Sequence, residues 1–274
     1  MIIFPNCKIN LGLRILRKRN DGYHDLETVF YPLPLSDVLE IVQSPEKEVS
    51  FTGSGINIEN GSNNLCRKAY DLLKKDFPDL PAVKIHLHKA IPVGGGLGGG
   101  SSDAAFTLLL LNNKFNLGLT NEQLLHYALQ LGSDCPFFII NKPCFAEKRG
   151  ELLEQTTLNL SSYDFLLINP GIHISTADAF AGIVPSAPSK SVKEIIQQPI
   201  ETWKEELQND FEISVFIKHP EIKTIKEELY KKEAVYASLS GSGSTVYGIF
   251  RKDTPFQFSF PENYFVKRLA GQLQ

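Results

Sequence analysis

Cysteine is scarce in this chain, and its spacing does not suggest a function. Only four of the 274 residues are cysteine, and none is placed in a C-x-x-C pair: Cys7, Cys66, Cys135 and Cys144. This pattern favours reduced thiols over a disulfide framework, and a zinc site is less favoured still. The six histidines form no H-x-x-x-H pair either. We therefore expect no dedicated metal centre.

Long hydrophobic runs and an excess of charge of one sign are also lacking. The longest apolar runs are about eight residues, whereas a membrane-spanning helix needs about 20, and residues 1–5 do not form a signal peptide. Net charge is -3, with 22% charged and 42% hydrophobic residues, which is ordinary for a soluble enzyme. We expect a cytoplasmic protein without nucleic-acid or membrane partners. The length allows one large domain or two smaller ones.

Glycine, by contrast, is concentrated in one segment. Six of the seven residues from Gly94 to Gly100 are glycine, and the apolar run 104–111 follows directly. Glycine allows a ligand to approach the main chain, and a helix start directs unpaired N–H groups and a positive dipole end outwards. Ser101, Ser102 or Asp103 can cap that helix. The segment predicts a phosphate-binding loop rather than a flexible linker.

The three commonest scaffolds for nucleotide phosphates do not fit this loop. A dinucleotide fold expects a following strand and an acidic residue about 20 positions on, and neither is found. A Walker A loop needs G-K-[ST] after the glycines, and no lysine stands there. The protein-kinase motifs V-A-I-K and H-R-D are missing too. A phosphate site remains, on some other scaffold.

Hydrophobic periodicity predicts a mixture of strands and helices without strict βαβ alternation, which favours the α+β class. We expect a division near residue 155, giving domains 1–155 and 156–274. Residues 185–200 are rich in Pro, Ser and Lys and indicate a mobile connector. Strands are expected at 2–16, 27–31, 37–42, 49–52, 83–88, 137–140, 164–169, 237–240 and 245–250, and helices at 102–112, 65–76, 120–131, 201–216 and 222–231.

Three polar residues in apolar surroundings are candidates for chemistry. Lys8 lies mid-strand, where a lysine is often merely solvent-facing, but it can also direct a cation at a phosphate or an acceptor oxygen. Asn10 lies on the same strand face, two residues on. Asp134 follows a helix end and is either a simple turn former or a base that accepts a hydroxyl proton.

A second small-residue loop, Ser240-Gly241-Ser242-Gly243-Ser244, stands near the end of the chain. Alone it indicates an ordinary tight turn, but two such loops make a shared phosphate pocket more credible. Tyr23 and His24 follow an Asp-Gly turn. They either pack a hairpin or stack on and hydrogen-bond a nucleobase.

Together these residues resemble the GHMP kinase superfamily, in family order and over nearly the full length. The matching motifs are Lys8-Ile9-Asn10-Leu11, Asp21-Gly22-Tyr23-His24, the segment from Pro92 to Ser102, Gly132-Ser133-Asp134-Cys135-Pro136-Phe137, and Ser240-Gly241-Ser242-Gly243-Ser244. Any one motif would be weak, but the set is highly specific. Within the superfamily the match is to the branch that acts on a cytidine-diphospho-methylerythritol.

The resemblance implies a two-domain GHMP-kinase-like α+β fold with the active site in the cleft between domains. It implies ATP-dependent phosphorylation of the substrate's 2-hydroxyl in non-mevalonate isoprenoid precursor biosynthesis, with Asp134 as base, Lys8 beside it, and Mg2+ bridging the ATP phosphates. It also implies a monomer or weak homodimer. The implied ATP-binding residues are Pro92, Val93, Gly94, Gly95, Gly96, Leu97, Gly98, Gly99, Gly100, Ser101 and Ser102. The implied substrate-binding residues are Tyr23, His24 and Phe180 for the cytosine, and Asn10, Ser240 and Gly241.

Three positions depart from the pattern. Val93 stands where methionine is frequent, which conserves volume. Asp103 stands where Asn is common and adds a negative charge near the phosphates, and Lys148 replaces a position that is often glycine. Two rival interpretations stay open. One is a GHMP kinase for homoserine or mevalonate, against which Tyr23 and His24 argue. The other is a catalytically silent nucleotide-binding protein, against which Lys8 and Asp134 argue.

Overall fold

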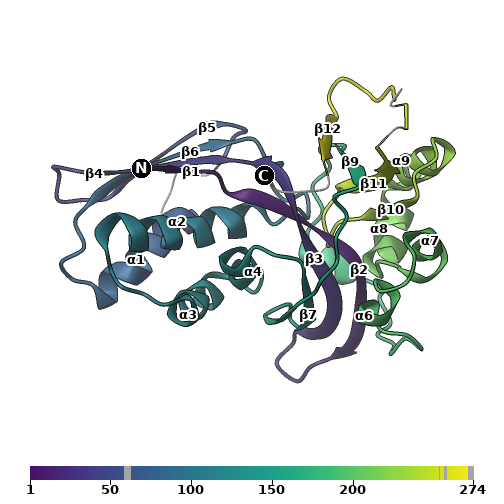
Figure 1. Cartoon of the computed structure of the whole chain (residues 1–274), viewed down its shortest axis with the longest axis horizontal. Helices are drawn as coiled ribbons and strands as arrows, with labels where there is room; N and C mark the ends of the chain where they lie inside the picture. Colours follow the sequence, from purple (N-terminus) through teal and green to yellow (C-terminus); the bar gives the residue numbers. More distant parts are fainter. Residues whose placement is uncertain (59–62, 253, 256–257, 271–274) are drawn as a thin grey trace. The chain divides into compact units, whose positions relative to one another are not determined.

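The chain passes repeatedly between two structural units (Figure 1). The computed structural model describes residues 1–58, 63–252, 254–255 and 258–270. Unit 1 comprises Met1–Cys7, Leu35–Val93 and Gly98–Asn141, and unit 2 comprises Lys8–Pro34, Gly94–Leu97 and Lys142–Gln274. Within the described residues, the strands form three four-stranded sheets. The domains 1–155 and 156–274 differ from these units in the residues they hold and stay a prediction.

Unit 1 contains one sheet with helices on one of its faces. The strand order is β1-β4-β6-β5, and β4 is antiparallel but β5 parallel to β6. Helices α1 and α2 cover the sheet, with α3 and α4 beyond them (Figure 1). The bounds are β1 Ile2–Ile3, β4 Val38–Gln43, β5 Ser50–Gly55, β6 Val83–Lys89, α1 Leu65–Asp76, α2 Gly99–Phe115, α3 Asn121–Leu131 and α4 Cys135–Ile140.

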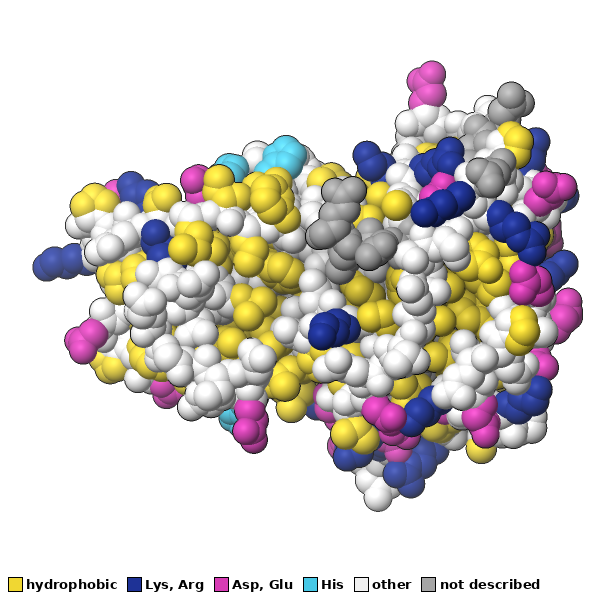
Figure 2. Space-filling model, viewed as in Figure 1, with side chains coloured by type: hydrophobic (Ala, Val, Ile, Leu, Met, Phe, Trp, Pro, Cys, Tyr) yellow, Lys and Arg dark blue, Asp and Glu magenta, His cyan; other side chains and the backbone are white. Residues whose placement is uncertain are grey.

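Strand β6 alternates as the sequence predicts. Val83, Ile85 and Leu87 are buried toward the helices. On the opposite face, His86 Nε2 and His88 Nδ1 each lie 3.0 Å from the Ser54 hydroxyl. Figure 2 shows histidine side chains (cyan) on this face, over β5 and β6. The period-2 pattern therefore separates a core face from a solvated one.

Unit 2 contains two antiparallel sheets. One has the order β2-β3-β7-β8 and the other β10-β11-β9-β12. The strands are β2 Asn6–Lys18, β3 His24–Ser36, β7 Cys144–Lys148, β8 Leu152–Gln155, β9 Tyr163–Asn169, β10 Tyr236–Leu239, β11 Val246–Arg251 and β12 Phe265–Ala270. The helices are α5 Thr176–Phe180, α6 Val192–Ile195, η1 Ile200–Thr202, α7 Trp203–Glu206, α8 Phe211–Lys218 and α9 Pro220–Lys231.

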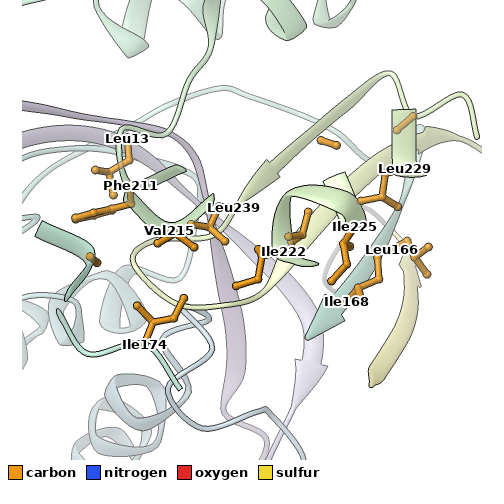
Figure 3. Close-up of a cluster of buried hydrophobic side chains, with 14 of the residues drawn as sticks. Leu13, Leu166, Ile168, Ile174, Phe211, Val215, Ile222, Ile225, Leu229 and Leu239 are labelled. Atoms are coloured by element: carbon orange, nitrogen blue, oxygen red, sulfur yellow. The ribbon is translucent and has the colours of Figure 1, made fainter. Parts of the chain in front are cut away.

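The core of unit 2 lies between α8, α9 and the second sheet. Leu166 and Ile168 of β9 face Ile222, Ile225 and Leu229 of α9, and all five are buried (Figure 3). Within the described residues, no helix has the length and apolar character needed to cross a membrane.

Residues 137–140, expected as a strand, belong to helix α4. Pro136 stands in the first turn of that helix, where its fixed φ is favourable and its missing N–H costs nothing. Asn141 ends it in the left-handed region, with φ 51°. A short apolar run is ambiguous between strand and buried helix, and here the proline decides.

Two other expectations also need correction. The helix expected at 201–216 is broken into η1, α7 and α8, because the chain turns extended at Leu207. Helix α2 starts at Gly99 after a left-handed Gly98, without a side-chain cap, so Ser101, Ser102 and Asp103 lie inside the helix.

Most remaining elements agree with the sequence. Helix 65–76 is confirmed, and the capping box of Thr120 and Gln123 is present at α3. The connector 185–200 contains the short α6, which has its own capping box. Strands β7, β8 and β12 were not expected.

Removing buried volume beside β9 tests the core of unit 2. Ile222 is 0% exposed and Ile217 is 77% exposed. We expect Ile222→Ala to lower the free energy of unfolding by about 2–5 kcal/mol and Ile217→Ala by less than about 0.5 kcal/mol. Urea unfolding can be followed by fluorescence, because the single tryptophan, Trp203, is buried in this unit. Equal effects of the two variants would contradict this core assignment.

Candidate functional site

The two glycine-rich loops meet main chain to main chain within unit 2. The Ser240 hydroxyl donates to the Gly96 carbonyl at 2.8 Å, and the Thr245 amide donates to the Gly95 carbonyl at 3.1 Å. A Cβ on Gly96 would overlap the Ser240 carbonyl, and one on Gly243 would overlap the backbone of residues 95–96. Glycine is needed at Gly96 and Gly243 because no side chain fits between the main chains of the two loops.

Lys8 is connected to this contact through Asn10. The Lys8 side chain is buried, so the solvent-facing alternative is excluded. Its ammonium donates to Asn10 Oδ1 at 2.6 Å and lies 4.6 Å from the Phe30 ring centroid. Asn10 Nδ2 donates to the Thr28 hydroxyl at 3.1 Å, and the backbone N–H of Asn10 donates to the Ser240 hydroxyl at 3.3 Å. A buried cation and the late glycine loop therefore belong to one hydrogen-bond network.

Two asparagines that the sequence did not single out hold the late loop. Asn209 Nδ2 donates to the carbonyls of Leu239 at 2.8 Å and Gly241 at 3.0 Å. Asn169 Nδ2 donates to the hydroxyls of Ser244 and Thr245, at 3.1 and 2.9 Å. Asn169 is the last residue of a predicted strand, and this position was the one hint to its role in the sequence. Asn209 lay inside a predicted helix.

The first turn of α2, in unit 1, forms the second half of the early glycine segment. Every second residue from Gly94 to Gly98 has a left-handed φ: 69° at Gly94, 81° at Gly96 and 68° at Gly98. The first hydrogen bond of the helix runs from the Ser102 amide to the Gly98 carbonyl, at 2.9 Å. The three preceding helical amides, at 99–101, therefore point out of the helix end. This arrangement suits an anion.

Asp134 stands next to this turn within unit 1. It is half-buried and precedes α4, which packs on α2. Burial raises the pKa of the neighbouring Cys135 thiol to about 12, and a hydrogen bond with Ser101 opposes that rise. The Cys135–Ser101 contact links the Asp134 segment to the first turn of α2.

Asp103 is paired inside unit 1. The Lys89 ammonium donates to Asp103 Oδ2 at 2.6 Å and to Asp37 Oδ2 at 2.5 Å, and all three side chains are buried. The charge of Asp103 is thus partly compensated by Lys89. No sequence motif singles out Lys89, although the alternation of β6 puts it on the buried face with Leu87.

The predicted base-binding residues lie together in unit 2. The His24 ring stacks on Phe180, with centroids 4.5 Å apart and an interplanar angle of 18°. Burial, and then the charge of Lys18, lower the pKa of His24. Tyr23 is 55% exposed, and the Arg149 guanidinium lies 4.9 Å from its ring centroid.

Lys148 adopts the conformation that a glycine would favour. Its φ is 61°, in the left-handed region, where non-glycine residues are uncommon. The turn is therefore compatible with lysine, at some cost in backbone strain.

Comparison with known proteins places these residues in a family context. Residues 64–142 match the family described as "GHMP kinases N terminal domain", and residues 191–259 match "GHMP kinases C terminal". A 4-diphosphocytidyl-2-C-methyl-D-erythritol kinase of Bacteroides thetaiotaomicron is 55% identical, over 92% of this chain and 93% of that protein. One of Azobacteroides pseudotrichonymphae is 54% identical, over 92% and 94%.

A solved structure agrees with the sequence comparison. The crystal structure of a 4-(cytidine 5'-diphospho)-2C-methyl-D-erythritol kinase superposes with a TM-score of 0.80 and 27% identity. The match covers 99% of this chain and 100% of that one. The fold is thus the two-domain α+β fold of these kinases. On sequence and on structure, the chain belongs to the 4-diphosphocytidyl-2-C-methyl-D-erythritol kinase family of the GHMP kinases.

Proposed function

We propose that the protein phosphorylates the 2-hydroxyl of 4-diphosphocytidyl-2-C-methyl-D-erythritol with ATP, in non-mevalonate isoprenoid precursor biosynthesis. Membership of the GHMP kinases makes it an ATP-using small-molecule kinase. The observation that carries the proposal is the hydrogen-bond network from Lys8 through Asn10 and Ser240 to Gly96. It ties a buried cation to main chain that is shaped for phosphate.

ATP phosphates bind residues 92–102 in this proposal. The left-handed glycines and the outward amides of the α2 start supply neutral donors for the phosphate oxygens. Mg2+ bound together with ATP would supply positive charge that offsets the charge of the phosphates. Among the described residues, no group of three or more His, Cys, Asp or Glu is arranged to hold a metal ion. We assign Mg2+ no protein ligand.

Asp134 acts as the base and Lys8 stabilises charge at the acceptor. As the hydroxyl attacks the γ-phosphorus, its proton passes to the Asp134 carboxylate, and the bond from phosphorus to the bridging oxygen of ADP breaks. The Lys8 ammonium offsets the negative charge that develops on the acceptor oxygen. Its hydrogen bond to Asn10 restricts where that charge lies.

The cytidine portion is held by Tyr23, His24 and Phe180. The His24–Phe180 stack presents an aromatic surface from two segments distant in sequence. The lowered pKa of His24 keeps its ring neutral at pH 7, so one ring nitrogen donates and the other accepts. Asn10, Ser240 and Gly241 contact the methylerythritol portion.

We also propose a cytoplasmic monomer or weak homodimer. All four cysteines are reduced and buried, which suits a reducing compartment. Two rival functions are separated by one assay. Incubation with Mg-ATP and a panel of the cytidine-diphospho alcohol, homoserine and mevalonate tests which alcohol is phosphorylated. ATP binding without turnover of any of them supports the silent nucleotide-binding protein and contradicts our proposal.

Substitution of the two charged residues tests their roles. We expect Asp134→Asn to lower kcat about 10²- to 10⁴-fold, because the base is lost. Lys8→Met, which keeps the apolar stem, should lower kcat by about 10²-fold or more. The measurement is steady-state turnover with the cytidine-diphospho alcohol, with circular dichroism to verify folding.

Asp71→Asn is the matched control, because Asp71 is a carboxylate on α1 paired with Arg67. Its turnover should stay within about twofold of the wild type, as an exposed i,i+4 pair contributes little. Folded Asp134→Asn and Lys8→Met variants that turn over like the wild type would overturn both role assignments.

Truncation of an exposed aromatic tests recognition of the cytosine. We expect Tyr23→Ala to raise KM for the cytidine substrate about tenfold, because a stacked base contributes about 1–3 kcal/mol, and to leave KM for ATP unchanged. Phe4→Ala is the control, since Phe4 is 62% exposed in unit 1. A change in KM for ATP, with KM for the cytidine substrate unchanged, would contradict the assignment of Tyr23 to the cytosine.

A further inference from the structure

A buried ion network lies beneath the start of α2. The Lys89 ammonium bridges Asp37 and Asp103, and the three side chains are 0–4% exposed. Asp37 is fixed independently, because its Oδ1 accepts from the amides of Ala90 and Ile91 at 2.6 and 2.9 Å. Lys89 and Asp37 thus form a rigid base on which Asp103, a residue of α2, is anchored.

Gly99, the first residue of α2, rests directly on Lys89. A Cβ at Gly99 would lie 2.9 Å from Lys89 Nζ and 3.0 Å from Ile91 Cγ2. The lack of a side chain lets the helix start approach the ammonium this closely. The position of the outward amides at 99–101 therefore depends on where Lys89 is held.

The network is not electrically neutral. Two carboxylates and one ammonium give a net charge of -1 when all are ionised. Asp103 Oδ1 and Ser102 Oγ are buried without a hydrogen-bond partner in the described part of the chain. The titratable groups that face Asp103 are Lys89 of β6, Asp37 before β4, and the Cys66 thiol of α1. An anion bound at the helix start is thus opposed by an uncompensated carboxylate.

We propose that Lys89 and Asp103 are positioning residues for the nucleotide phosphates: their ion pair holds the first turn of α2, and the charge on Asp103 sets how strongly that turn attracts an anion. This inference rests on the proposed function only in taking the start of α2 as the phosphate site. It does not depend on which alcohol is phosphorylated.

A proton on Asp103 would remove the excess charge. Burial, together with the nearby Asp37 carboxylate, raises the pKa of Asp103 to about 7 against the attraction of Lys89. Bound phosphates add negative charge and raise that pKa further. The protonated form therefore binds nucleotide more tightly, so affinity is highest below pH 7 and falls as the pH rises through 7.

Asp103→Asn tests the charge. Asparagine retains an oxygen to accept from Lys89 but leaves the network neutral at every pH. For the wild type we expect Kd for Mg-ADP to rise about threefold to tenfold between pH 6 and pH 8, with proton uptake on binding. The variant should lack this extra rise and this uptake. Isothermal titration calorimetry in buffers of different ionisation enthalpy measures both.

The phosphates of Mg-ADP titrate in the same way whichever variant is measured. The difference in pH dependence and proton uptake between the wild type and Asp103→Asn therefore reports the effect of the network alone. Asp164→Asn is the control, because Asp164 is a mostly buried carboxylate paired with Arg268 in unit 2. It should bind with the wild-type pH dependence. Equal pH dependence and proton uptake in the wild type and Asp103→Asn would overturn the charge-setting role.

The triple variant Asp37→Asn/Lys89→Met/Asp103→Asn tests positioning. It removes the cation that holds Asp103 but is neutral, as Asp103→Asn is, and the side-chain oxygen at position 37 can still accept from its two backbone donors. We expect Kd for Mg-ADP to rise about tenfold relative to Asp103→Asn at every pH, because the helix start is no longer held. A Kd within twofold of that of Asp103→Asn would overturn the positioning role.

The same titrations separate this inference from the proposed function. A wild type that binds Mg-ADP with the expected pH dependence but does not phosphorylate the cytidine-diphospho alcohol would contradict the proposed substrate and support the network. A wild type that phosphorylates this alcohol, but whose affinity for Mg-ADP is independent of pH, would support the proposed substrate and contradict the network.

Discussion

Close approach of main chain to main chain at Gly96 and Gly243 is the constraint on which the candidate site in unit 2 depends. Because these glycines leave no side chain between the loops, the Ser240 hydroxyl reaches the Gly96 carbonyl. Ser240 in turn meets the Asn10 amide, and Asn10 holds Lys8. Each further contact requires the backbone contact first. A single Cβ would therefore disturb the early loop, the late loop and the buried cation together.

The two buried lysines, Lys8 and Lys89, have different surroundings. Lys8 donates to the side-chain oxygen of Asn10 and lies over the Phe30 ring. Lys89 lies between two carboxylates, which more than offset its charge and raise its pKa despite burial. Burial makes either charge costly unless it is compensated. The pairing of Lys89 with two carboxylates suits structural support.

Local sequence patterns were sufficient for much of the fold and for part of the candidate site. The α+β class, the helix at 65–76 and both glycine loops follow from periodicity and glycine content. Helix α4 did not, because a four-residue apolar run carries no period. The break at Leu207 and the contacts of Lys89 with Asp37 and Asp103 depend on partners far away in sequence. The alternation along β6 shows that Lys89 faces inward, but it does not show which residues Lys89 contacts.

Burial of all four cysteines has a practical consequence. Low dielectric surroundings raise the pKa of the Cys66, Cys135 and Cys144 thiols, and Cys7 is 0% exposed. These three thiols form almost no thiolate at neutral pH, and thiolate is the form that reacts with electrophiles. We therefore expect the native cysteines not to react with maleimide. One cysteine introduced on the surface would take up a fluorophore alone, without any native thiol having to be removed first.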